Sequence, residues 1–252
     1  MKINLLYSTI ALAVCLLFLG CDREAEIERE YGHWEYENTD WENLGYGSCA
    51  GNSQSPINID TQFTVPSSDL PEVSYNYTPF EMRIVDNGHT IQVNGPGENV
   101  SVTYNDVAYE FVQFHFHRLS EHQINTSHTA MELHVVHQDE NGNLLVLGYM
   151  IEPGSNNPFL QTVFNHIPEE EKVEIATGIT IDLTPIQPNN KNYYTYSGSL
   201  TTPPCTAAVQ FVIFKETMQA DPQQIELFAS YYNDNYRPVQ PLNNRFVLEK
   251  ID

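Results

Sequence analysis

The segment that decides both the fold and the chemistry of this chain is Gln113-Phe114-His115-Phe116-His117. Its polar and aromatic residues alternate, which is typical of a β-strand, so His115 and His117 project from one face while the phenylalanines pack into the other. A second strand is expected over Met131 to Val136, with His134 on one of its faces. The sixteen residues between the second and third histidines are enough to return the chain as an antiparallel neighbour.

Three convergent histidines are typical of a catalytic zinc site. Three neutral imidazoles leave Zn²⁺ its full charge and a fourth position for water, whose pKa the ion lowers. A lone histidine in a strand is more often structural, so the hypothesis rests on His115 and His117 together with His134, which shares a strand face with Glu132. The other histidines of this segment are interpreted as structural or surface residues: His122, His128 and His137.

The composition places these strands in a globular protein. The 252 residues include 33 acidic and 11 basic side chains, a formal net charge of −22, which excludes nucleic-acid binding by broad phosphate neutralisation. The chain is 41% hydrophobic and only 17% charged, so it can bury a core. The acidic balance suits a salty or alkaline exterior, but a solvated acidic surface needs no such habitat.

Turn signals predict many short strands and few helices. Two Asn-Gly pairs between apolar runs predict hairpins, Asn87-Gly88 joining residues 82–85 to 90–93 and Asn141-Gly142 joining residues 133–136 to 144–151. Asp221-Pro222 and Asn157-Pro158 are expected to begin helices, the second of which runs through Phe164. We therefore expect a mainly β fold, with a mostly antiparallel sheet and peripheral short helices in a single domain.

The N-terminus has the features of an export signal. Lys2 precedes an apolar run of ten residues from Ile10 to Leu19, which is too short to span a membrane comfortably. The run ends at Gly20-Cys21, which resembles a bacterial lipoprotein cleavage box with Cys21 as the acylated residue; an ordinary signal peptide is the alternative. We interpret residues 1–20 as the signal peptide, 21–31 as an acidic tether and 32–252 as the catalytic domain, exported to the periplasm or cell envelope.

Cysteine usage agrees with export. Of four cysteines, Cys15 lies in the leader and Cys21 is the candidate anchor, which leaves Cys49 and Cys205 in the exported domain. Two cysteines in an oxidising compartment predict one disulfide, and two free buried thiols are the alternative. No later segment approaches 18 consecutive apolar residues, so the expected contact with a membrane is through the N-terminal lipid alone.

Several motifs from about residue 34 to the C-terminus resemble the α-class carbonic anhydrases, most closely their exported bacterial members. In addition to the histidine strand and Glu132-Leu133-His134, the matching segments are Gly32-His33-Trp34-Glu35-Tyr36, Gln54-Ser55-Pro56-Ile57-Asn58, Asn87-Gly88-His89, Ser120-Glu121-His122, Ser199-Leu200-Thr201-Thr202-Pro203-Pro204 and Arg237-Pro238-Val239-Gln240-Pro241-Leu242. The resemblance implies a large twisted sheet around a cleft with zinc at its base, and reversible hydration of carbon dioxide to bicarbonate and a proton.

The resemblance also implies roles for individual residues. His115, His117 and His134 would bind zinc, while Gln113 and Glu132 would accept ring N–H groups and fix the tautomers. Thr201 would accept a hydrogen bond from the zinc-bound hydroxide and donate its own proton to Glu121, and Thr202 would contact bicarbonate. The residues matching the apolar wall beside carbon dioxide, which would otherwise pass for ordinary core positions, are Val136, Val146, Leu200 and Phe211.

His89 matches the position of the family's proton shuttle. A group with a pKa near 7 in the cleft can export the proton that each cycle releases, and histidine fits this need. Without the resemblance, His89 is a solvated histidine after a hairpin turn.

Two rival functions are weighed against this interpretation. A cupin-like metal dioxygenase would need Glu121 to bind metal and would leave the segments around His89 and Thr201 unexplained. A non-catalytic binding module related to carbonic anhydrases should have lost a ligand histidine, and this sequence keeps all three.

Overall fold

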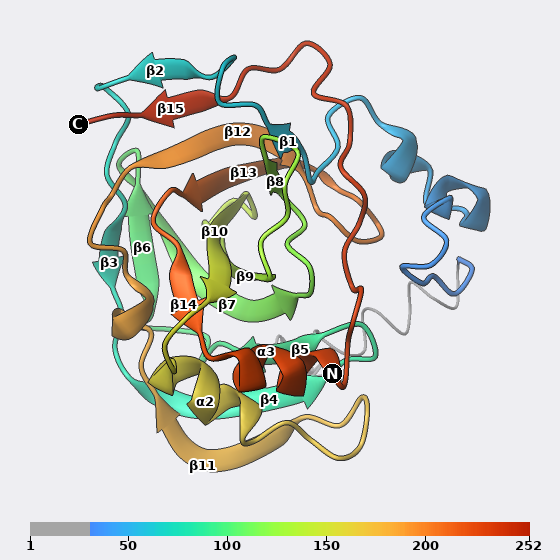
Figure 1. Ribbon diagram of the computed structural model, residues 1–252, viewed down its shortest axis with the longest axis vertical. Coiled ribbons are helices and arrows are strands. Elements are labelled where there is room, and N and C mark those ends of the chain that lie inside the picture. Colours follow the sequence, from blue (N-terminus) through green and yellow to red (C-terminus); the bar gives the residue numbers. More distant parts are fainter. Residues whose placement is uncertain (1–30) are drawn as a thin grey trace, which may run out of the picture.

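The computed structural model describes residues 31–252, and a 13-stranded sheet is the central element of this part of the chain (Figure 1). The strands are β1 (Asn58–Ile59), β2 (Val65–Ser67), β3 (Ser74–Asn76), β4 (Phe80–Asp86), β5 (Ile91–Asn94), β6 (Ser101–Tyr104), β7 (Val107–His117), β8 (Gln123–Ile124), β9 (Met131–Gln138), β10 (Leu144–Pro153), β11 (Ile175–Ile181), β12 (Tyr193–Ser199), β13 (Ala207–Phe214), β14 (Met218–Ala220) and β15 (Leu248–Lys250). The α-helices are α2 (Pro158–Phe164) and α3 (Pro222–Ala229), and the short 3-10 helices are η1 (Trp41–Leu44), η2 (Gly47–Ala50) and η3 (Thr184–Ile186).

The sheet is mostly antiparallel, as the sequence predicts. Its main path runs β11-β4-β5-β7-β9-β10-β13-β12-β15-β2, and β3, β6 and β14 pair outside this path. The parallel exceptions are β10 with β13, β10 with β14, and β15 with β2, while β1 and β8 form a separate two-stranded parallel sheet. Figure 1 shows β11 and β2 at opposite ends of the molecule, with β7, β9 and β10 between them.

Both predicted hairpins are confirmed. Strands β4 and β5 pair with Asp86 opposite Ile91, so Asn87-Gly88 lies in their connection, and β9 and β10 pair across Asn141-Gly142. Gly88 adopts a φ of +91°, a left-handed conformation that glycine reaches without the clash that a β-carbon would cause.

The helices begin where the sequence predicts. Asn157 caps α2 by accepting the backbone N–H groups of Phe159 and Leu160. Asp221 caps α3 in a complete capping box with Gln224. Figure 1 shows the two helices together on one side of the sheet. No helix of residues 31–252 has the length and apolar character needed to span a membrane.

The two faces of strand β7 have different surroundings. Phe114 and Phe116 are fully buried in the main hydrophobic core, where Phe159 and Phe164 of α2 and Phe228 of α3 contact them. This aromatic packing holds one face of β7 against the core and leaves the opposite face, which carries His115 and His117, available to form a site. The predicted partition of the alternating segment into a core face and a histidine face is therefore confirmed.

The N-terminal segment forms its own small cluster. Cys49 and Cys205 are joined by a disulfide and pack with Trp34, Trp41 and Tyr46. The predicted disulfide is confirmed, and the alternative of two free thiols is wrong. Closing a loop of 156 residues lowers the conformational entropy of the unfolded chain, which destabilises the unfolded state by about 4 to 5 kcal/mol. The predicted signal peptide, the candidate anchor Cys21 and the tether up to residue 30 lie outside the described residues.

Candidate metal centre

The three predicted ligand histidines converge on one point. Strands β7 and β9 pair antiparallel with His115 directly opposite His134, and His117 lies opposite Glu132. One ring nitrogen from each of His115, His117 and His134 lies within 4.8 Å of the others. His117 and His134 are almost completely buried. The register of one strand pair therefore assembles the triad, because period-two alternation places all three rings on the same face.

Each ring is held by a hydrogen bond at the nitrogen that faces away from this point. Nδ1 of His115 lies 2.9 Å from Oε1 of Gln113, and Nε2 of His134 lies 2.8 Å from Oε1 of Glu132. Nδ1 of His117 lies 2.8 Å from the backbone oxygen of Asn235. These acceptors require an N–H at the bonded nitrogen, so the lone pairs of His115 Nε2, His117 Nε2 and His134 Nδ1 remain for a metal.

The donor set fits zinc. Nε2 of His117 is buried and has no hydrogen-bond partner in the described structure, a costly state for a polar atom unless it binds a ligand. Three imidazole nitrogens with oriented tautomers are the ligand set of a catalytic zinc site with an open fourth position. The residues present therefore match the ion that the sequence implies.

Glu132 positions two histidines at once. Besides His134, its carboxylate accepts the backbone N–H of His122 at 2.8 Å and contacts His122 Nδ1 at 2.8 Å. Nε2 of His122 in turn lies 2.6 Å from the hydroxyl of Tyr196, which donates to Ser55. His122 thus acts structurally, as predicted. His122, Glu132 and His134 could also be taken for a metal group, but hydrogen bonds among themselves already occupy their facing atoms.

The electrostatics of the triad follow from burial and from these carboxylates. Burial lowers the pKa of His115 well below its ordinary value, and the neighbouring His117 and His134 lower it further. Burial also lowers the pKa of His117, although Glu121 opposes this change. Burial works against protonation of His134 too, but Glu132 outweighs it and raises the pKa of that ring. Two of the three rings therefore favour the neutral form that metal binding requires.

Glu121 is fully buried and points toward the triad. Its Oε2 lies 3.3 Å from His117 Nε2 and 3.8 Å from His134 Nδ1, and its Oε1 accepts the backbone N–H of Arg237 at 2.9 Å. No hydrogen bond joins Glu121 to Thr201 in the described part of the chain, and Glu121 Oε2 has no hydrogen-bond partner there. Thr201 is buried two residues after the end of β12, on the loop that carries Cys205.

The predicted apolar wall forms a second hydrophobic cluster on the histidine side of the sheet. Val136, Val146 and Phe211 are buried in this cluster, and Leu200 packs against it. Val146 pairs with both Val136 and Phe211 across the neighbouring strands, and the Phe211 ring centroid lies 6.0 Å from that of His134. These four side chains therefore form an apolar surface next to the triad.

The predicted shuttle residue is more buried than its alternative interpretation requires. His89 is only 7% exposed and stacks on Trp34, with ring centroids 3.7 Å apart and planes inclined by 12°. The interpretation as a solvated histidine is therefore wrong, because the N-terminal segment covers the ring. A cavity of about 70 Å³, called the inner cavity below, connects His89 to the site; its lining includes Trp34, His89, Gln92, Gln113, His115 and Thr202.

Two residues of the site were not predicted. The side-chain amide of Asn235 donates to the backbone oxygens of His89 and Phe116 and accepts the backbone N–H of Arg118. The backbone carbonyl of Asn235 accepts a hydrogen bond from Nδ1 of His117. No sequence pattern marks Asn235, since its contacts come from a loop that is distant along the chain. Arg237 begins one of the segments that resemble the family, but the sequence predicted no role for it.

The guanidinium of Arg237 is buried and joins several segments of the site's support. It donates to Gln54 Oε1 and to the backbone oxygens of Ser55 and Cys49, and it lies over the ring of Trp41 at 5.0 Å. Burial lowers the pKa of this guanidinium to about 10, so it still carries its charge at neutral pH. Through its backbone N–H the same residue holds Glu121, which ties the disulfide region to the metal centre.

A three-histidine centre in a large mixed β-sheet is typical of zinc enzymes of the lyase or hydrolase type. The family model of eukaryotic-type carbonic anhydrases matches residues 36–251. The chain belongs to this family, the α-class carbonic anhydrases.

Individual relatives and a solved structure support this family assignment. A carbonic anhydrase of Neisseria gonorrhoeae is 38% identical over 250 residues, covering 96% of this chain and 98% of the relative. A carbonic anhydrase of Klebsiella pneumoniae is 35% identical, covering 86% and 91%. Among solved structures, the α-carbonic anhydrase of Thermovibrio ammonificans in complex with the inhibitor sulfanilamide is 40% identical with a TM-score of 0.81, covering 86% of this chain and 98% of that one.

Proposed function

We propose that the chain catalyses the reversible hydration of carbon dioxide to bicarbonate and a proton, with zinc held by His115, His117 and His134. The observation that carries the proposal is the convergence of three oriented imidazole nitrogens, with a buried His117 Nε2 that has no hydrogen-bond partner. When bound, zinc lowers the pKa of its water to about 7, an effect for which carbonic anhydrase is itself the standard example.

Zinc analysis with stopped-flow carbon dioxide hydration tests this function. The purified protein should hold about one zinc per chain and hydrate carbon dioxide rapidly. Removal of the metal by a chelator should abolish the activity, and sulfanilamide should inhibit it. A preparation with bound iron, or one that is zinc-loaded but inactive, would contradict the proposal. Family membership already argues against the cupin-like alternative, and the complete triad argues against a non-catalytic binding module.

The residues around the metal have separate roles in this proposal. Thr201 accepts a hydrogen bond from the attacking oxygen and donates its own proton to Glu121, which orients a lone pair toward the substrate carbon. Glu121 is suited to this role because its Oε2 is buried and has no hydrogen-bond partner within residues 31–252. Thr202, in the lining of the inner cavity, contacts bicarbonate. Val136, Val146, Leu200 and Phe211 hold carbon dioxide by apolar contact.

Replacing the threonine tests the orienting role. Thr201→Ala should keep its zinc but lose about 100-fold in turnover, because a hydrogen bond that orients the attacking oxygen is lost while the ligands remain. Stopped-flow assays and metal analysis measure the two effects separately. Thr206→Ala, at an exposed position near the same loop, is the matched control and should behave as the wild type. Unchanged turnover in Thr201→Ala would remove Thr201 from the mechanism.

We assign proton export to His89. Each hydration cycle releases one proton, and imidazole titrates in the range needed to carry it. His89 lines the same inner cavity as His115 and Thr202, which supports the assignment. His89→Ala should lower kcat about 10-fold in weak buffer and leave kcat/KM nearly unchanged, since export follows the chemical step. Imidazole buffer should restore kcat, and an equal fall in both parameters would contradict the role.

The disulfide supports a location of the domain outside the cytoplasm, in an oxidising compartment. We further propose that residues 1–20 are removed on export, that Cys21 is acylated and that residues 21–31 tether the catalytic domain of residues 32–252. The glycine and cysteine at positions 20 and 21 support this assignment. Cys21→Ala should move the protein from the membrane fraction to the soluble fraction, and an unchanged distribution would contradict the lipid anchor.

A further inference from the structure

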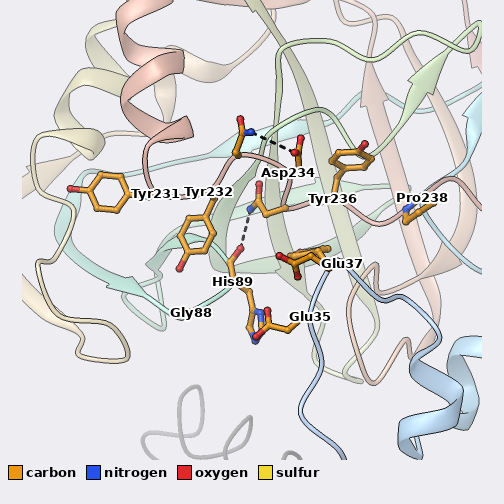
Figure 2. A pocket seen from close by; sticks show the side chains of 12 residues that line it. Glu35, Glu37, Gly88, His89, Tyr231, Tyr232, Asp234, Tyr236 and Pro238 are labelled. Atoms are coloured by element: carbon orange, nitrogen blue, oxygen red, sulfur yellow. Dashed lines mark hydrogen bonds between the residues drawn. The ribbon is translucent and has the colours of Figure 1, made fainter.

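His89 lies between two cavities, and it has little direct contact with solvent. On one side it lines the inner cavity, which reaches His115. On the other side it lines an open pocket of about 530 Å³, called the outer pocket below, whose walls include Glu35, Glu37, His89, Tyr232, Asp234 and Tyr236. Figure 2 shows His89 and Glu35 on one side of this pocket, across from Asp234 and Tyr236. A proton that reaches His89 can therefore leave by the outer pocket.

The surroundings of His89 hold it in this position. Its backbone N–H donates to Asn87 Oδ1 at 2.9 Å, and its carbonyl accepts from Asn235 Nδ2 at 3.0 Å. The ring stacks on Trp34, which belongs to a buried cluster. Since His89 is only 7% exposed, proton transfer directly from its ring to bulk base is restricted, and an exposed acceptor beside it would shorten the path.

Such an acceptor pair lies next to His89. The ring centroid of His33 is 6.2 Å from that of His89, a separation that a water molecule can bridge. Nε2 of His33 lies 2.6 Å from Oε1 of Glu35, and the two side chains are 57% and 53% exposed. The backbone of Glu35 is fixed in turn, because its carbonyl accepts the indole N–H of Trp41 at 3.0 Å.

We infer that His33 and Glu35 form an exit relay that takes the proton from His89 and delivers it to solvent. The inference rests on the proposed shuttle role of His89. The imidazolium of His89 gives its proton through water to neutral His33, and Glu35 stabilises the resulting His33 imidazolium. That imidazolium then protonates a buffer base, so one proton leaves and both histidines return to the neutral form.

The charge of the outer pocket favours this direction of transfer. Glu37 and Asp234 add two carboxylates to its walls, and none of its lining residues in the described chain is lysine or arginine. Lys172 packs beside the turn at Gly88, so it supplies one positive charge nearby. The acidic surroundings therefore stabilise a positive charge at the mouth of the path, which favours movement of the proton outward from His89.

Two variants test the relay in the full-length, zinc-loaded enzyme. His33→Ala removes the acceptor, and Glu35→Gln keeps a hydrogen-bonding partner for His33 while removing the group that stabilises its charge. In a weak, bulky buffer, both should lower kcat about 3- to 10-fold and leave kcat/KM for carbon dioxide within about 2-fold. Small imidazole buffer should restore kcat. Glu98→Gln, at an exposed position outside the outer pocket, is the matched control and should keep wild-type kcat.

His89→Ala, measured in the same assay, separates this inference from the shuttle assignment. If His89→Ala keeps wild-type kcat, the shuttle role fails and the relay fails with it. If His89→Ala lowers kcat while His33→Ala does not, the relay alone is wrong. A fall for His33→Ala with wild-type kcat for Glu35→Gln would indicate only a displaced N-terminal segment, and it would also overturn the relay. In the His89→Ala background, adding His33→Ala should cause no further loss.

Discussion

His134 and His137 lie three residues apart on strand β9 and have opposite surroundings. Both are buried, with His134 2% exposed and His137 fully covered. Alternation along the strand points His134 toward the metal centre and His137 into the aromatic core, where Phe111 and Tyr77 pack against its ring. The same strand thus offers two buried histidines, only one of which belongs to the site.

The partners of the two rings explain the difference. His134 contacts the carboxylate of Glu132, whereas His137 has the Tyr77 hydroxyl at 3.0 Å and the backbone oxygen of Val135 at 3.1 Å. Burial therefore lowers the pKa of His137 to about 3, while Glu132 overcomes burial and raises the pKa of His134. Burial alone therefore does not mark a functional histidine: His134 differs from His137 in the face of β9 that it occupies and in its hydrogen bond to Glu132.

The largest expected effect is the loss of the metal. His134→Ala should remove most of the bound zinc and nearly all carbon dioxide hydration, because two imidazoles hold the ion far more weakly than three. Metal analysis and stopped-flow assays measure both. His137→Gln is the matched control on the same strand, and it should retain about one zinc per chain. A full complement of zinc in His134→Ala would show that His134, like His137, is not a metal ligand.

A smaller effect is expected from replacing Glu132, whose carboxylate contacts His134. Glu132→Gln keeps the shape of the side chain but removes the charge that orients His134, so zinc affinity should fall about 10- to 100-fold. Competition with a chromophoric chelator measures the affinity. Glu110→Gln, at an exposed position on β7, should leave it unchanged. Wild-type affinity in Glu132→Gln would show that the carboxylate only fills space.

The smallest effect concerns acid stability. The native pKa of His137 is about 3 and the ordinary histidine value is 6.5, so between these values the unfolded chain binds a proton that the native chain does not. Stability should therefore fall as the pH falls from about 6.5 toward 3, by up to about 1.4 kcal/mol per pH unit from this group. Urea unfolding across this range should show a shallower slope for His137→Gln. The half-buried His166→Gln is the control, and equal slopes in His137→Gln and wild type would contradict the assignment.

The strand-level features could be predicted from the sequence because they follow from local periodicity. Alternation around His115 fixed which side chains share a face, and the two Asn-Gly turns fixed the neighbouring pairs. The start of each α-helix followed from an Asx-Pro pair, since the cap depends only on adjacent residues. The ligand triad therefore required only one correct strand register.

The supports that come from distant loops could not be predicted in this way. Asn235 holds both His117 and the turn of His89 from a position 118 residues beyond that ligand. The burial of His89 depends on Trp34, which a pattern around Asn87-Gly88 does not reveal. Tertiary contacts of this kind leave no periodic signal, so the alternative interpretation of His89 as a solvated histidine is wrong.

The most direct test of the metal centre is an anomalous difference map at the zinc edge, from crystals of the purified protein. We expect one strong peak contacted by His115 Nε2, His117 Nε2 and His134 Nδ1, with Glu132 bound to His134 and His122 rather than to the metal. A peak among His122, Glu132 and His134, or a zinc-loaded protein with no peak at the triad, would contradict it.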